Sequence, residues 1–353
     1  GLSTMLIKKP RNIYGTTPSL LVELEAQHET GAPTTVVTDG AWRATRNGPV
    51  RGADILNGET YDARREMPGW DAVGFDTSSW HPVAVGDAPI AGPRLVAQPN
   101  EPIRVTEELK PVRLTEPKPG VFVFDLGQNM VGWCRLAVRG KAGATVRLRH
   151  AEMLDEAGLV YTENLRGALQ TDVYTLRGGA SESFEPQFTY HGFRYVEVTG
   201  DVERLRLGDL VGRAVHSAVT PAGAFESSDA LLNQLWKNIV WTQRDNMHSV
   251  PTDCPQRDER LGWMGDILVF AQTAIYNFDM AAFLKKWVVD VRDAQADDGR
   301  FPDFAPHPFG RNERFTGAPG WGDAGVVVPW RAYENYGDTR ILAPCDGGVR
   351  ERR

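Results

Sequence analysis

The period of the hydrophobic pattern changes near residue 225, and this change constrains the fold more than any other feature of the sequence. Between about 13 and 215, short runs alternate apolar and polar residues, and Gly, Pro, Asp and Asn separate the runs. This pattern is typical of β-strands joined by turns. After 225, apolar residues recur every three or four positions, as on one face of a helix. A β half followed by an α half predicts separate β and α domains.

The β half divides at a segment rich in proline and polar residues. Residues 83–118 have weak periodicity and are typical of a linker. Beyond 118, short apolar runs follow one another at the close spacing of a β-sandwich. We therefore expect four parts: a first β domain over 1–90, a linker over 91–118, a β-sandwich over 119–220 and a helical domain over 221–353.

The helical half contains four expected helices. Ser228 or Asp229 can cap the first helix, because short polar side chains accept hydrogen bonds from the first amides of a helix. Its apolar face is formed by Leu232, Leu235, Trp236 and Ile239. The other helical patterns cover 265–277, 280–296 and 326–336. The tail after 342 is polar and does not resemble a helix that packs into a core.

The charge balance excludes one class of partner. The sequence has 353 residues, of which 39 are basic and 46 acidic, for a net charge of −7. No long run of Lys and Arg is present. Because proteins bind nucleic acids through clustered positive charge, we expect no nucleic-acid partner. A neutral, polar or cationic ligand fits this balance better.

Cysteine spacing and the short apolar runs argue against disulfide-rich, zinc-ribbon and membrane-spanning proteins. Cys134, Cys254 and Cys345 are widely spaced and form no CxxC pair, so we expect neither a disulfide framework nor a zinc ribbon, and no cofactor. No apolar run approaches the roughly 18 residues of a membrane span, and the start lacks the apolar core of a signal peptide. These features favour a cytoplasmic protein without a membrane partner. The first residue is Gly rather than Met, which indicates that the sequence begins inside a longer reading frame.

The densest group of reactive side chains lies between two expected helices, in residues 252–266. Five acids and guanidinium groups fall between Asp253 and Arg260, and one Pro and two Gly predict a loop. Interleaved arginines can hold one carboxylate ionised while a drier neighbour stays protonated near neutral pH. Trp263 offers a flat face for a sugar ring. The alternative interpretation is a solvated, salt-bridged loop that Trp263 anchors.

Residues 250–266 read Val-Pro-Thr-Asp-Cys-Pro-Gln-Arg-Asp-Glu-Arg-Leu-Gly-Trp-Met-Gly-Asp. This segment closely resembles the signature of the bacterial α-L-rhamnosidases of glycoside hydrolase family 78. Further segments that resemble this family are 57–64, 125–133, 188–196, 320–324 and 328–330. The resemblance covers almost the whole chain, from about 13 to 342.

The resemblance implies a multidomain fold, with an accessory β domain of the carbohydrate-binding type, a β-sandwich and an (α/α)6 catalytic barrel. It also implies inverting hydrolysis of terminal α-L-rhamnosyl residues. In such a reaction one carboxylic acid protonates the leaving oxygen, while a carboxylate on the opposite ring face, about 6.5–9.5 Å away, activates water. The expected partner is a rhamnose-containing oligosaccharide or glycoside. The oligomeric state is left open.

By motif position, Glu259 matches the general acid of the family. The positions that match substrate contacts are Asp253, Arg257, Trp263, Asp266, Trp321 and Asp323. The resemblance implies that the aspartates accept hydrogen bonds from rhamnose hydroxyls, that Arg257 orients the acids and that Trp263 packs against the apolar side of the sugar. An alternative role for Asp266 is to cap the helix that follows. No metal ligand is expected, and His150 and His191, far from any second His at ligand spacing, are expected to be core histidines.

The expected barrel exceeds the length of the helical half. Twelve helices and their connections need about 300 residues, whereas 129 residues lie between 225 and 353 inclusive. We therefore expect a fragment with a partial accessory domain and a partial barrel, inactive by itself, whose general base lies beyond residue 353. Two alternatives stay open, a non-catalytic carbohydrate-binding remnant and another six-hairpin glycosidase.

Overall fold

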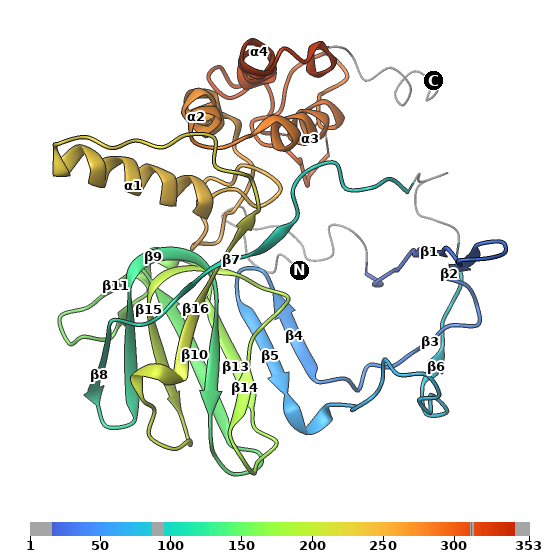
Figure 1. The fold of residues 1–353 in the computed structure, drawn as a ribbon, viewed down its shortest axis with the longest axis vertical. Coiled ribbons are helices and arrows are strands. Elements are labelled where there is room, and N and C mark those ends of the chain that lie inside the picture. Colours follow the sequence, from blue (N-terminus) through green and yellow to red (C-terminus); the bar gives the residue numbers. More distant parts are fainter. Residues whose placement is uncertain (1–15, 87–94, 311, 313, 343–353) are drawn as a thin grey trace.

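The computed structural model describes residues 16–86, 95–310, 312 and 314–342 of the 353. Figure 1 shows a curved β region from the first two thirds of the chain and a helical region from the last third that lies over one end of it. The expected order of a β-rich part followed by a helical part is confirmed. The polar tail after 342 and Cys345 fall outside the described residues.

The first strands of the β region are β1 (Glu23–Ala26), β2 (Thr34–Val37), β3 (Arg43–Ala44), β4 (Val50–Asp54), β5 (Gly58–Asp62), β6 (His81–Pro82), β7 (Ile103–Leu109) and β8 (Arg113–Lys118). They continue with β9 (Val121–Val138), β10 (Thr145–Ala151), β11 (Met153–Leu154), β12 (Val160–Tyr161), β13 (Thr171–Thr175), β14 (Glu182–Phe184), β15 (His191–Gly200) and β16 (Leu210–Ser217). Short 3-10 turns are η1 (Ala63–Arg65), η2 (Glu163–Leu165), η3 (Leu207–Asp209) and η4 (Thr339–Ile341).

Ten of these strands form one sheet. Its order is β4-β5-β13-β10-β15-β9-β16-β7, and β8 and β14 also pair with β9. The β5–β13 pair is parallel, and the other pairs are antiparallel. Strands from the expected first β domain and from the expected linker thus lie in the same sheet as those of the expected β-sandwich. The domain boundaries given above stay a prediction.

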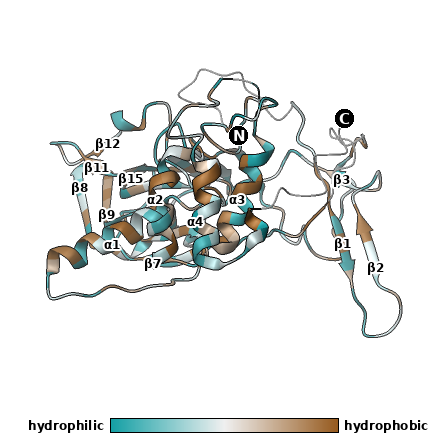
Figure 2. Ribbon diagram, turned by 90° about the horizontal axis from the view of Figure 1, so that it is seen from above, coloured by the Kyte–Doolittle hydropathy of each residue, from teal (hydrophilic) through white to brown (hydrophobic). Residues whose placement is uncertain are grey.

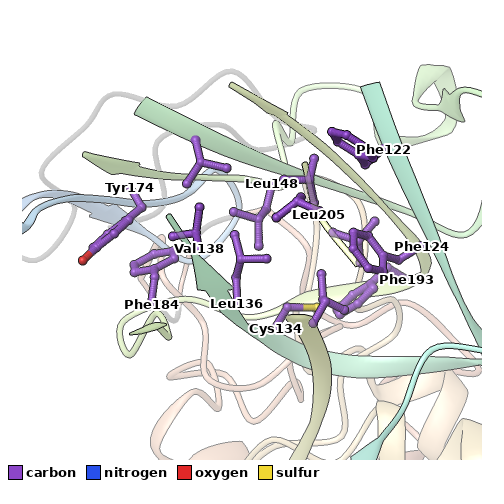
Figure 3. Close-up of a cluster of buried hydrophobic side chains, with 14 of the residues drawn as sticks. Phe122, Phe124, Cys134, Leu136, Val138, Leu148, Tyr174, Phe184, Phe193 and Leu205 are labelled. Atoms are coloured by element: carbon purple, nitrogen blue, oxygen red, sulfur yellow. The ribbon is translucent and has the colours of Figure 1, made fainter. Parts of the chain in front are cut away.

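The long strand β9 organises the core of the β region. From Gly132 to Val138, buried residues alternate with half-buried ones, as the two-residue period of a strand requires. Gly132 has φ +151°, and a Cβ there would collide with the carbonyl of Arg213 on β16, so only glycine fits. Phe124 and Leu136 of β9 pack with Leu148 of β10 and Phe193 of β15 in one cluster, shown in Figure 3.

The helical region contains α1 (Ala230–Asp245), α2 (Met264–Asn277), α3 (Ala281–Asp293) and α4 (Ala324–Tyr336). These are the four expected helices, although α3 ends three residues earlier and α4 begins two residues earlier than expected. Asp229 caps α1, because its Oδ1 accepts a hydrogen bond from the amide of Leu231 at 2.8 Å. A second core, with Phe283 and Trp287 of α3 at its centre, joins α2, α3 and α4.

The expected apolar face of α1 is only partly covered. Leu232 and Leu235 are exposed to solvent, and Figure 2 shows apolar residues distributed along the helices. The C-terminal end of α1 instead meets the sheet, where Trp241 packs against the β core. Among the described residues, the helices are all too short or too polar to cross a membrane.

Candidate active site

The loop between α1 and α2 lies where the two regions meet. Its start is tied to the β region, because Oδ1 of Asp245, the last residue of α1, accepts a hydrogen bond from the amide of Val131 on β9 at 2.9 Å. Two hydrogen bonds close its middle. The Asp253 amide donates to the Leu261 carbonyl at 3.1 Å, and the Leu261 amide donates to Asp253 Oδ1 at 3.1 Å. Gly262 packs so closely against the carbonyl of Ala305 that a Cβ would collide with it. The loop is therefore held at both ends and across its middle.

Three carboxylates gather within and just after this loop. Burial, together with the nearby charges of Glu259 and Asp266, raises the pKa of Asp253 to about 7. Asp266 is solvent-exposed on one side, but partial desolvation and the charge of Glu259 also raise its pKa. Glu259 is buried. Because carboxylates that share a site resist ionising together, Asp253 stays partly protonated near neutral pH.

Two arginines hold the carboxylate of Glu259. Arg257 Nε lies 3.3 Å from Glu259 Oε2, and Arg166 Nη2 lies 2.8 Å from the same oxygen. Arg166 also reaches the neighbouring Asp258, with 2.7 Å between its Nε and Oδ1. Arg257 belongs to the loop itself, whereas Arg166 follows η2 in the β region. The Glu259 side chain is therefore held by one arginine from the loop and one from the β region.

Arg260 points away from these carboxylates and into the β region. It is buried and donates to the backbone carbonyls of Ile55 and Tyr190. It also donates to Oε1 of Gln170 at 3.3 Å. Its guanidinium also lies over the Tyr190 ring, 4.8 Å from the ring centre. Burial lowers the pKa of Arg260. This side chain fastens the loop to two β segments that are distant in sequence.

An aromatic group stands beside the carboxylates. Trp263 packs edge-on against Phe304, with ring centres 4.8 Å apart, and Phe315 lies 6.1 Å away. The Nε1 of Trp263 is buried and has no hydrogen-bond partner among the described residues. Trp321 lies against Gly265, where a Cβ would come within 2.9 Å of its Nε1. The two expected tryptophans therefore both lie at the start of α2.

The two remaining expected contacts sit at helix starts. Trp263 occupies the N-cap position of α2, so Asp266 is not the N-cap; it lies in the first turn, where a carboxylate interacts favourably with the helix dipole. Asp323 is exposed at the start of α4, and its Oδ2 accepts a hydrogen bond from the Gly320 amide at 3.2 Å. That bond shapes the turn before α4. A role of Asp323 in substrate binding stays a prediction.

A polar pocket of about 350 Å³ opens beside the loop, between the end of α1 and the β region. Its lining residues are Asn129, Glu152, Thr242, Asp245, Asn246 and residues 253–257. Burial raises the pKa of Asp245 to about 8. Asp253 and Arg257 belong to both this pocket and the carboxylate group, so the two are adjacent.

Two groups of side chains have the composition of metal ligands. His150, Asp172 and His191 each offer an atom within 4.8 Å of the others, and so do Asp253, Cys254 and Glu259. The two histidines, which have no second His at ligand spacing in the sequence, stack with ring centres 4.3 Å apart, because β10 and β15 are neighbours in the sheet. Both are fully buried and hydrogen-bonded, which confirms them as core histidines. The absence of a metal and of a cofactor stays a prediction.

Three family models match successive parts of the chain. The α-L-rhamnosidase N-terminal domain matches residues 2–107, the bacterial α-L-rhamnosidase concanavalin-like domain matches 115–216, and the bacterial α-L-rhamnosidase six-hairpin glycosidase domain matches 220–345. The chain belongs to the bacterial α-L-rhamnosidase family. This confirms the family that the motif 250–266 indicated.

Relatives in this family are similar along almost the whole chain. An α-L-rhamnosidase of Streptomyces avermitilis is 51% identical over 330 residues, which are 94% of this chain and 32% of that protein. One from Formosa agariphila is 39% identical over 340 residues, 92% of this chain and 35% of that protein. The chain therefore spans about a third of the length of these relatives.

Solved structures of rhamnosidases have the same fold. The crystal structure of the S. avermitilis α-L-rhamnosidase complexed with L-rhamnose superposes with a TM-score of 0.89 at 50% identity, covering 96% of this chain and 32% of that one. The native α-L-rhamnosidase of Aspergillus terreus gives 0.85 at 39% identity, covering 96% of this chain and 39% of that one. The expected β domains followed by part of a six-hairpin glycosidase domain are confirmed.

Some residues of this candidate site could not be predicted from the sequence. Arg166 lies 93 residues before Glu259, in a polar turn with no motif around it. Phe304 and Phe315 follow a Gly-containing stop and belong to no periodic pattern. Only the closing of the chain on itself brings these side chains to the loop.

Proposed function

We propose that this chain forms the acid-carrying part of an inverting α-L-rhamnosidase, with Glu259 as the general acid. One observation carries this proposal: the buried Glu259 is held by two arginines, Arg166 and Arg257, and its carboxylate lies within 4.8 Å of that of Asp253. The S. avermitilis relative, whose structure contains L-rhamnose, supports the substrate class. The substrate would be a glycoside or oligosaccharide with a terminal α-L-rhamnosyl residue.

The geometry suits proton donation to a leaving oxygen. Arg166 and Arg257 both approach Oε2 of Glu259, so Oε1 is the oxygen that can carry the proton. As that proton moves to the glycosidic oxygen, the bond from the oxygen to the sugar carbon breaks, and water adds from the opposite ring face. The negative charge left on Glu259 then lies between two cations, which stabilises it.

The neighbouring side chains would bind the sugar. Asp253 and Asp266 would accept hydrogen bonds from its hydroxyl groups, and Trp263 would pack against the apolar face that includes the C6 methyl group. An apolar wall favours a methyl over a hydroxymethyl group by about 1–3 kcal/mol. We assign the general base to no described carboxylate, because Asp253, Asp258 and Asp266 lie on the same segment as the acid, and the base must approach the opposite ring face.

The test needs the remainder of the enzyme. We define the chimera as the S. avermitilis α-L-rhamnosidase in which this chain replaces the matching third. In the chimera, Glu259→Gln should slow hydrolysis of alkyl rhamnosides, which have poor leaving groups, by about 100-fold or more. p-Nitrophenyl α-L-rhamnoside should be affected much less, because its leaving group needs little protonation. Glu334→Gln, at an exposed site on α4, is the matched control and should have no effect.

The alternatives predict other results. Equal loss on both substrate classes, or no loss, would remove Glu259 from the role of acid. Rhamnose binding without turnover would favour a carbohydrate-binding remnant, and turnover of other glycosides from a p-nitrophenyl panel would favour another six-hairpin glycosidase.

A further inference from the structure

Backbone strain is concentrated where the β region meets the active-site loop. Arg166 and Gln170 in the β region have φ of +56° and +44°, and Arg260 in the loop has φ of +57°. Side chains other than glycine rarely adopt such angles, and they keep them only where the surroundings enforce them. Gln170 and Arg260 contact one another at 3.3 Å, and Arg166 contacts Glu259, the residue before Arg260. The three strained residues therefore belong to one contact between the two regions.

The turn that carries Arg166 is firmly anchored. It follows η2, where Leu165 is fully buried. Gln170, at its other end, is also fully buried, and its side-chain amide donates to the carbonyls of His150 and Gly192 and accepts from the Gly192 amide. Arg166 therefore extends from a fixed position on the sheet.

The guanidinium group of Arg166 contacts two carboxylates. Its Nε is 2.7 Å from Asp258 Oδ1, and its Nη2 is 2.8 Å from Glu259 Oε2. Both acids are nearly buried, whereas Arg166 keeps about a third of its side chain exposed. A planar guanidinium fixes the orientation of such carboxylates more strictly than a single charge does.

We propose that Arg166 is a positioning residue for the general acid, supplied by the β region to a site in the helical region. This inference rests on the proposed role of Glu259. Arg166 holds Oε2, so that Oε1 faces the leaving oxygen, and it stabilises the carboxylate that remains after the proton has left. The other charged groups around Glu259 are Arg257, Asp253, Asp258 and Asp266. Among them and Arg166, Arg166 alone comes from the β region.

Leaving-group dependence in the chimera separates positioning from a merely structural ion pair. Arg166→Ala should lower kcat/KM for alkyl rhamnosides by about 10-fold or more, and for p-nitrophenyl α-L-rhamnoside by about 3-fold or less. Arg166→Lys should restore part of the loss, and added guanidinium ion should partly rescue Arg166→Ala. The matched control is Arg149→Ala, because Arg149 is exposed and binds the same turn through Thr162 Oγ1 at 2.9 Å without touching the loop.

The outcomes distinguish this inference from the proposed function. If the unaltered chimera is active and Glu259→Gln shows the leaving-group pattern, equal losses on both substrates for Arg166→Ala, or no loss, overturn the inference alone. If the unaltered chimera does not hydrolyse rhamnosides, the proposed function fails, and the positioning is judged on the 353-residue chain itself. There, Arg166→Ala should speed amide hydrogen exchange in residues 257–261 by about 10-fold relative to Arg149→Ala. Unchanged exchange would overturn the inference.

Discussion

The β region and the helical region bury their apolar side chains in different ways. In the sheet, Phe124, Leu126 and Met130 of β9 are buried by strands that come from many parts of the chain. The helices bury one face against each other and leave another in solvent. Leu231 of α1 is 76% exposed, and Val269 of α2 is 81% exposed. A curved sheet completes its own core, whereas a few helical hairpins complete only the side on which they meet.

The family relationship explains why the helices bury only one of their faces. The helical part matches a six-hairpin domain, and the chain spans about a third of the length of its relatives. The helices of this chain therefore combine an exposed apolar face with a packed core. Stability should therefore depend on which face of a helix is altered.

The largest expected effect contrasts two tryptophans of the helical region. Trp287 of α3 is fully buried, and Trp330 of α4 is 50% exposed. Trp287→Ala should reduce the free energy of unfolding of the helical region by about 3–5 kcal/mol, because it leaves a cavity in the core. Trp330→Ala should cost less than about 1 kcal/mol. Urea unfolding, with hydrogen exchange to assign the change to a region, measures both, and similar costs would contradict the two-faced description.

A smaller effect is expected at the connection between the regions. Arg260→Ala should reduce the free energy of unfolding by about 1–3 kcal/mol, because the carbonyls of Ile55 and Tyr190 lose a buried donor. The two regions should then unfold at more widely separated urea concentrations. The matched control is Arg331→Ala, on the exposed side of α4. A single transition that moves equally in both variants would show that Arg260 does not couple the regions.

The smallest effect concerns pH at the same boundary. Burial raises the pKa of Asp245 from 3.8 to about 8, so its carboxyl is neutral in the folded chain and takes up a proton on folding. Its contribution to stability is complete below about pH 4 and is lost as the pH rises through about 8. Asp245→Asn should flatten this dependence and raise the free energy of unfolding at pH 8 by about 1–2 kcal/mol.

Chemical denaturation at several pH values measures this change. The control is Glu226→Gln, since Glu226 is exposed. Asp253 and Asp172, whose pKa values burial raises to about 7 and about 6, should keep part of the slope in Asp245→Asn. Parallel curves for the unaltered chain and Asp245→Asn would show that Asp245 is ionised in the folded protein.

Local sequence was enough to predict the elements that depend on neighbouring residues. A cap at Ser228 or Asp229 and all four helices could be predicted, because helical periodicity and capping act within a few positions, and the structure has the cap at Asp229. The segment 250–266 could be identified, because one loop carries its whole set of acids and arginines. Strand pairing could not be predicted, since β5 pairs with β13 more than a hundred residues later.

The sequence by itself determined the order of β and α parts, the family and the position of Glu259 in its motif. Tertiary structure alone decided that Arg166 meets Glu259 across 93 residues and that Arg260 leaves the carboxylates to enter the β region. The physical reason is that charge and hydrogen-bonding capacity are local properties of a residue, whereas the partner that satisfies them depends on how distant segments pack. Periodicity specifies which face of a helix or strand is buried, but not what is buried against it.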